Sequence, residues 1–125
     1  MAVQLIRQSG ERRTIQKYGG GGFTIGGVRF AGSVLILPDS VTLWPVTTFA
    51  NISEGAIEGV VKQALAFDIC LLGCGSRVER LPAALRSYLR AAGLRIEPME
   101  TGAACRTFNV LAAEGPALAA ALIAI

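Results

Sequence analysis

The sequence predicts a layered α/β protein with a mixed sheet, folded as one domain over residues 1–125. Two observations predict this class. The first fifty residues contain short apolar or alternating runs broken by glycines, whereas later segments repeat apolar side chains at helical spacing. From there to the C-terminus helical and extended patterns alternate, which is typical of an α/β domain. With 52% hydrophobic residues, a chain of this length buries one core without disulfide or metal support.

The N-terminal half is expected to be rich in β-strands. The glycines at 19–22 and 26–27 are turn residues, and Pro38-Asp39-Ser40 forms a further turn. Four successive glycines also suggest a phosphate-binding loop, but no helical pattern follows them, so a tight or bulged turn is favoured. The predicted strands are 3–6, 15–18, 23–25, 28–30, 33–37 and 41–46, the last around Trp44.

The C-terminal half is expected to contain two or three helices. The first is predicted from Glu54 to Ala66 behind an Asn51 cap, with a face formed by Ile57, Val60, Val61, Ala64 and Leu65. The second begins at Pro82 and ends at Gly93.

The third helix is predicted to begin at a Thr101 cap and to end at 114–115. Its buried face is expected to hold Ala104, Phe108, Leu111 and Ala112, with Phe108 and Leu111 against the strand that starts at Ile69.

Extended segments separate the helices. The run 69–72 is wholly apolar, which indicates a central strand buried on both faces, and 94–98 is a second strand. The last residues, 116–125, fit either a strand or an alanine-rich helix, because an all-apolar run shows neither period.

Composition excludes several classes of function. The chain has no histidine, so it lacks the base of Ser-His and Cys-His catalysis. Three cysteines without histidine do not complete a four-ligand zinc site, and no metal or cofactor is expected. An odd number of cysteines favours a reducing cytoplasm. The charge-free stretch 115–125 would reach only about 17 Å as a helix, so no transmembrane segment is expected.

Two strand-to-helix junctions form the candidate ligand site, because ligands of α/β proteins collect where strands end. If Cys74 and Cys105 are neighbours there, the junctions form a pocket for an anion or small molecule, with redox chemistry as an option. The structural alternative makes Cys70 and Cys105 core residues and leaves Arg106 to pair locally, and we expect burial to keep Cys105 protonated. The candidate residues are Gly73, Cys74, Gly75, Ser76, Thr101, Gly102, Cys105, Arg106 and Asn109.

A group of arginines is the candidate partner surface. Residues 77–95 carry five basic side chains and one acidic one. Arg86 and Arg90 are expected to share the solvent-facing side of the second helix, with Arg77 and Arg80 just before it. This surface is either a solvated face or a docking site for an acidic protein or anionic lipid headgroups. Nucleic acid is not expected, because no aromatic residues lie among the arginines.

Three segments, in order, resemble a known family. They are Gly-Gly-Phe23 with Ser-Val-Leu-Ile-Leu-Pro38 and Trp44; Asp68-Ile-Cys-Leu-Leu-Gly-Cys-Gly75; and Met99-Glu-Thr-Gly-Ala-Ala-Cys-Arg-Thr-Phe-Asn109 with Glu114-Gly115. These residues resemble the small uncharacterised domain family that includes mitochondrial NADH dehydrogenase (complex I) assembly factor three and its bacterial and archaeal relatives.

The resemblance implies a three-layer β plus α/β/α fold with an open mixed sheet, in which residues after Gly115 form a closing strand. It implies no established catalysis, and protein partners in the biogenesis of respiratory complexes or other membrane proteins. The N-terminus shows no transit peptide, so a bacterial, cytoplasmic member is expected.

Two functions are therefore expected as alternatives. The first is a non-enzymatic interaction protein that resembles assembly factors and acts at the cytoplasmic face of the inner membrane, with a homodimer as a further option. The second is a small-molecule- or anion-binding protein that uses the loops at Gly73–Ser76 and Thr101–Asn109.

Overall fold

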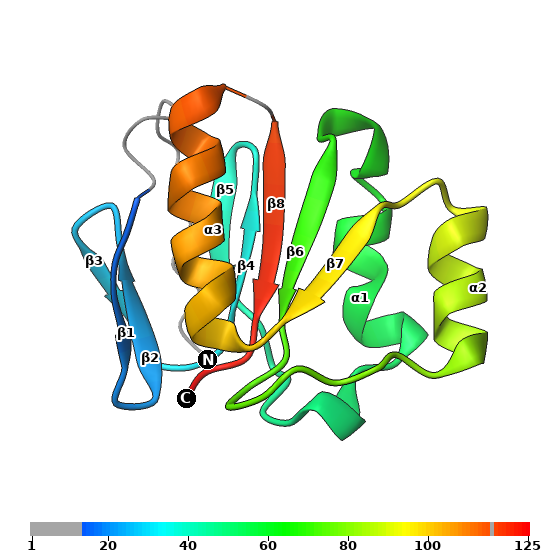
Figure 1. Cartoon of the computed structure of the whole chain (residues 1–125), viewed down its shortest axis with the longest axis horizontal. Helices are drawn as coiled ribbons and strands as arrows, with labels where there is room; N and C mark the ends of the chain where they lie inside the picture. Colours follow the sequence, from blue (N-terminus) through cyan, green and yellow to red (C-terminus); the bar gives the residue numbers. More distant parts are fainter. Residues whose placement is uncertain (1–13, 116) are drawn as a thin grey trace.

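Two β-sheets and three α-helices build the computed structural model, which describes residues 14–115 and 117–125. The expected strand at 3–6 lies outside the described residues. The remaining expected strands are present, and the chain forms the three-layer α/β arrangement that the resemblance implied (Figure 1).

The smaller sheet is an antiparallel meander of β1 (Ile15–Gly19), β2 (Gly22–Ile25) and β3 (Val28–Phe30). Its first turn uses the glycine run, where residues 19, 20 and 21 all have positive φ. Gly22 lies so close to β3 that a Cβ there would collide with the carbonyl oxygen of Phe30. The run is therefore a tightly packed hairpin turn and opens no helix.

The larger sheet is mixed, with the strand order β5-β4-β8-β6-β7. β8 pairs antiparallel with β4 and parallel with β6, and β6 pairs parallel with β7 at the sheet edge. The strands are β4 (Val34–Leu37), β5 (Ser40–Leu43), β6 (Ile69–Gly73), β7 (Ile96–Met99) and β8 (Leu118–Leu122).

β8 resolves the ambiguity at the C-terminus. All five of its residues are buried, and three of them are alanines. Ala119 and Ala121 face one core and Ala120 the other, so both faces of this strand are covered. The C-terminal segment is thus the closing strand that the resemblance implied.

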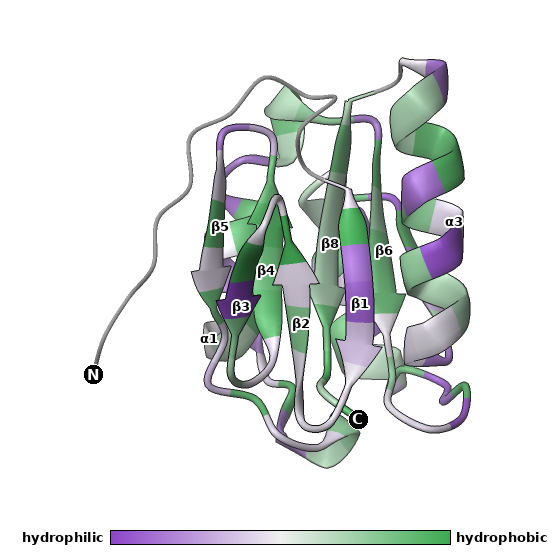
Figure 2. Ribbon diagram, turned by 90° about the vertical axis from the view of Figure 1, so that its left-hand side faces the viewer, coloured by the Kyte–Doolittle hydropathy of each residue, from purple (hydrophilic) through white to green (hydrophobic). Residues whose placement is uncertain are grey.

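Helices cover both faces of the larger sheet. α1 (Glu54–Val61) and α2 (Ala83–Ala91) pack on one face over Cys70 and Leu72. α3 (Thr101–Glu114) and the small sheet cover the other face, over Leu71 (Figure 1). Figure 2 shows the small sheet lying across the larger one, whose inner strands are strongly hydrophobic.

α1 differs from its prediction at both ends. Ser53, not Asn51, is the cap, and its hydroxyl accepts a hydrogen bond from the amide of Ala56. The α-helix ends at Val61, where the amide of Gln63 donates to the carbonyl of Val60 and the chain tightens into 3-10 pairing. A separate 3-10 turn follows at Ala64–Ala66, which leaves Leu65 fully exposed and not on the expected apolar face.

α3 begins one residue earlier than its predicted cap allows. Glu100 is the N-cap and Thr101 is the first helical residue. Ala104 and Phe108 are buried as expected, whereas Leu111 and Ala112 are only partly buried at the edge of the same core.

Candidate functional site

The two expected junctions meet at the carboxyl end of β6. The amide of Thr101 donates to the carbonyl of Gly75 (2.8 Å), and the amide of Gly75 donates to Oγ1 of Thr101 (2.9 Å). The same hydroxyl donates to the carbonyl of Ile123 after β8 (2.8 Å). Thr101 therefore joins three segments, and its hydroxyl is not a helix cap.

Gly73 is required by this close approach. A Cβ there would lie 2.9 Å from Oγ1 of Thr101 and 3.0 Å from a methyl carbon of Leu122. Gly75 has φ +110°, a conformation that favours glycine. Both glycines of Gly73-Cys74-Gly75 are thus explained by backbone geometry and packing alone.

The start of α3 is already occupied by a carboxylate of the chain. Glu100 accepts hydrogen bonds from the amides of Ala103 (2.7 Å) and Gly102 (3.3 Å). Unpaired amides at a helix start suit an anionic ligand. Because Glu100 accepts hydrogen bonds from these two amides, they are not available as donors to a ligand.

Arg106 and Asn109 connect α3 to the small sheet. Arg106 donates to the hydroxyl of Tyr18 (2.7 Å) and lies 3.4 Å from Glu100. The side-chain amide of Asn109 both donates to and accepts from the backbone of Ile15, each at 2.9 Å. These contacts support the structural alternative for both residues.

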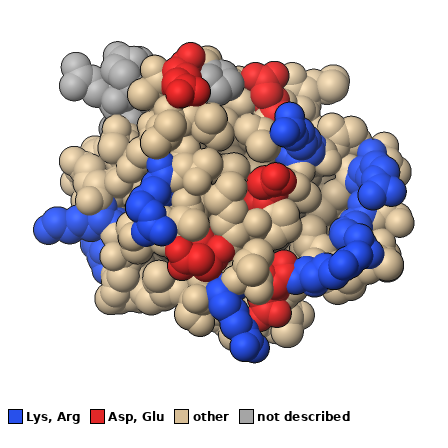
Figure 3. Space-filling model, viewed as in Figure 1, with Lys and Arg blue, Asp and Glu red and all other residues tan. Residues whose placement is uncertain are grey.

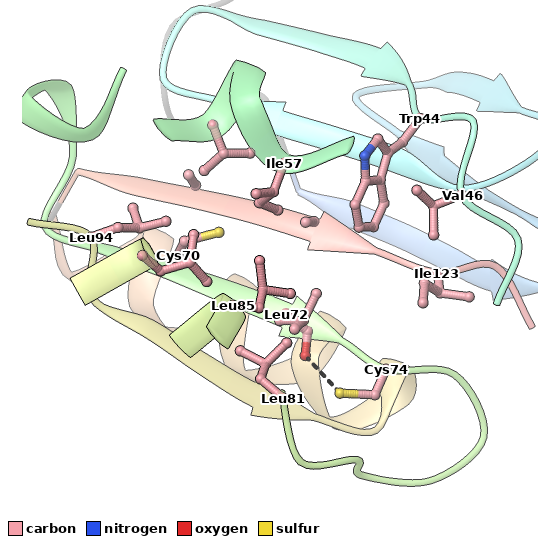
Figure 4. Packing of buried hydrophobic residues seen from close by; sticks show 14 of the residues in the cluster. Trp44, Val46, Ile57, Cys70, Leu72, Cys74, Leu81, Leu85, Leu94 and Ile123 are labelled. Carbon is pink, nitrogen blue, oxygen red and sulfur yellow. Dashed lines mark hydrogen bonds between the residues drawn. The ribbon is translucent and has the colours of Figure 1, made fainter. Parts of the chain in front are cut away.

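The cysteines lie in two different cores. Cys70 and Cys74 pack with α1 and α2, whereas Cys105 packs with α3 and the small sheet on the opposite face. Figure 4 shows Cys74 turned towards the backbone oxygen of Leu72, at 3.8 Å. The expectation that Cys74 and Cys105 are neighbours in one pocket is wrong.

Burial keeps the thiols protonated. Cys105 is 1% exposed, and burial raises its pKa to about 12, although the nearby charge of Arg106 acts in the opposite direction. Burial also raises the pKa of Cys70 to about 12 and raises that of Cys74. A thiolate is the reactive form, so none of these groups is poised for chemistry at neutral pH.

Three of the nine candidate residues line a hollow. Cys74, Gly75 and Ser76 border an open depression of about 610 Å³, together with 47–49 and 123–125. The residues of α3 do not border it. The structure thus brings Thr101 to Gly75 without bringing Cys105, Arg106 or Asn109 to the depression.

The arginines gather beside α2, as Figure 3 shows on the side where Figure 1 places α2 and β7. Arg77 lies 3.9 Å from Glu79. Arg80 and Arg90 are exposed, but Arg86 is only partly so, and its Nε atom is buried. The expectation of a fully solvent-facing Arg86 is therefore wrong, because Arg86 borders a cavity next to β7.

The sequence analysis missed two residues that take part in these contacts. Tyr18 bonds to Arg106 across 88 positions, and Arg95 joins the other arginines around the cavity. Neither contact has a local signal. For Arg95, the only usable sign was its place in the basic segment 77–95.

Comparisons with known proteins agree with this fold. The family model described as "Protein of unknown function (DUF498/DUF598)" matches residues 15–123. NADH dehydrogenase [ubiquinone] 1 alpha subcomplex assembly factor 3 is 32% identical over 121 residues in Xenopus tropicalis and 34% identical over 119 residues in Homo sapiens. These alignments cover 97% and 95% of this chain, but only 66% and 65% of the relatives.

Solved structures share the fold closely. The structure of a Bartonella henselae protein, described as an outer membrane protein, has a TM-score of 0.84 and 35% sequence identity to this chain. The matched region covers 90% of this chain and 95% of the Bartonella chain. The structure of a Bordetella pertussis protein, described as an Mth938-like domain, has a TM-score of 0.78 and 28% sequence identity to this chain. The matched region covers 99% of this chain and 92% of the Bordetella chain. The family predicted from the sequence is confirmed: the chain belongs to the DUF498/DUF598 family of proteins of unknown function.

Proposed function

We propose that this chain is a non-catalytic protein that binds other proteins during the assembly of a membrane complex of the NADH dehydrogenase kind. The observation that carries the proposal is the similarity to curated assembly factors, which extends over 95–97% of the chain. The match covers only 66% and 65% of the relatives' own length, so the proposal concerns the activity of this shared domain.

The geometry of the candidate site supports a binding role over a catalytic one. The polar groups of three candidate residues form hydrogen bonds that hold strands and helices together. These residues are Thr101, Arg106 and Asn109. The buried thiols of Cys70 and Cys105 stay protonated. Side chains committed to the fold in this way do not assemble a nucleophile with a base.

We propose the arginine surface, defined as Arg77, Arg80, Arg86 and Arg90, as the contact for an acidic region of the partner. Exposed charges of one sign speed the encounter with a surface of opposite charge. We place this contact at the cytoplasmic face of the membrane, where anionic headgroups also attract arginines. Among the described residues no helix is long and apolar enough to cross a membrane.

Affinity capture tests the proposal. We expect the tagged chain, purified from detergent-solubilised membranes of its source organism, to recover NADH dehydrogenase subunits in quantitative mass spectrometry. Charge reversal at two exposed arginines, Arg77→Glu with Arg90→Glu, should reduce recovery about tenfold or more, because each change replaces attraction by repulsion.

A matched control separates this surface from net charge. Lys17→Glu with Arg29→Glu makes the same change of charge at exposed positions of the small sheet, which covers the opposite face of the larger sheet from α2, and should leave recovery unchanged. Equal loss in both double variants would contradict the assignment of the surface. Recovery of only a second copy of the chain would contradict the proposed function.

A further inference from the structure

A cavity lies between α2 and the edge strand β7. Its volume is about 320 Å³. Leu89 of α2, Ile96 of β7 and Leu94 between them supply apolar lining. Leu89 and Leu94 are themselves buried, so the apolar part of this cavity is firmly held in the core.

Four arginines surround this apolar floor. They come from the loop before α2, from α2 itself and from the residue before β7, so the fold brings together charges that are separated in sequence. The four are Arg80, Arg86, Arg90 and Arg95.

None of the described residues that line the cavity is acidic. Ile96 and Pro98 border it, and neighbouring strand residues point to opposite faces, so Glu97 lies on the other side of β7. Glu79 is next to Arg77, outside the cavity. In the described part of the chain, the ion pairs within 4.0 Å involve Arg77 and Arg106 and none of the four cavity arginines.

Arg86 carries the strongest sign of a missing partner. Its Nε atom is buried and donates no hydrogen bond, and it is the one side-chain nitrogen or oxygen in this condition among the described residues. A buried donor without an acceptor costs stability, and the cost is higher for a charged group. Because Arg86 borders the cavity, an oxyanion there would supply the acceptor once the guanidinium group turns towards it, in the side-on geometry that guanidinium groups favour.

We propose that this cavity binds a small organic phosphate monoester, with the phosphate on the arginines and the organic part on the apolar floor. A monoester carries close to two negative charges at neutral pH, which suits four cationic groups better than one carboxylate does. The apolar floor calls for an aromatic or aliphatic body next to the phosphate. Arg80, Arg86 and Arg90 also belong to the arginine surface proposed for the protein partner, so the test of this site uses the purified chain without any partner.

The test uses 1-naphthyl phosphate as the probe, with inorganic phosphate and 1-naphthol as its two halves. We expect calorimetry with the purified chain to show 1-naphthyl phosphate binding at least about tenfold more tightly than either half, since only the whole probe uses both features. In nitrogen-15 spectra, the Nε–H signal of Arg86 should shift on titration with this probe.

Two matched variants locate the site. Arg86→Met keeps the apolar stem without the charge and should weaken binding about tenfold or more. Its melting temperature should stay the same or rise, because an unpartnered buried donor is removed. Arg77→Met, which removes an arginine outside the cavity, should leave the affinity within about twofold.

Three results would overturn the proposal. One is that 1-naphthyl phosphate binds no better than its halves. Another is that Arg77→Met weakens binding as much as Arg86→Met does. The third is Arg86-dependent binding to vesicles that contain phosphatidic acid without binding of free 1-naphthyl phosphate, which would assign the arginines to a membrane surface.

Discussion

Replacing Phe108 by alanine is expected to lower the free energy of unfolding by about 3–5 kcal/mol. Phe108 is 1% exposed and lies where α3, the small sheet and the larger sheet meet in one core. Truncation to alanine would remove the aromatic ring from that core and leave a cavity. The helix and the two sheets that surround the ring cannot all move inward to fill this cavity. Urea unfolding followed by circular dichroism measures the change.

Val110→Ala is the matched control on the same helix. Val110 is 59% exposed, so its truncation should change stability by no more than about 0.5 kcal/mol. An unchanged unfolding midpoint in Phe108→Ala would mean that α3 presents another face to the sheets.

Replacing Thr101 by valine is expected to have the second largest effect, a loss of about 2–4 kcal/mol. Valine keeps the shape of the side chain but leaves the amide of Gly75 and the carbonyl of Ile123 without their partner. Each buried polar group that loses its hydrogen bond costs about 1–3 kcal/mol. The unfolding free energy of the purified variant measures this loss.

Thr101→Ser separates the hydroxyl from the methyl group. Serine keeps the oxygen that bonds to Gly75 and Ile123 and should retain most of the stability, with a loss of about 1 kcal/mol for the missing methyl. A valine variant as stable as the serine variant would show that the hydroxyl does not hold these segments together.

The sequence predicted those parts of the fold whose signal is local. The apolar run at 69–72 became the buried strand β6, and the spacing of Ala104 and Phe108 identified the buried side of α3. The alanines of β8 show no period because both faces of this strand are buried, so only the family resemblance identified it as a strand.

The candidate site was less predictable because its contacts join distant segments. Asn109 bonds to Ile15, and Thr101 to Ile123, across 94 and 22 positions. The rule that functional loops meet where strands end correctly predicted that Gly75 lies next to Thr101. The same rule does not predict on which face of the sheet each cysteine packs. The partly buried position of Arg86 depends on how α2 packs beside β7. The spacing of residues within α2 does not predict this packing.

The most direct test of the proposed assembly role is the amount of complete NADH dehydrogenase in membranes of the source organism after deletion of the gene for this chain. On native electrophoresis we expect less complete complex and more partial complexes, with recovery when the wild-type chain or a Cys105→Ala variant is restored. Recovery by the cysteine variant is expected because Cys105 is buried and its pKa of about 12 keeps it unreactive. A normal amount of complete complex in the deletion strain would contradict the proposed function.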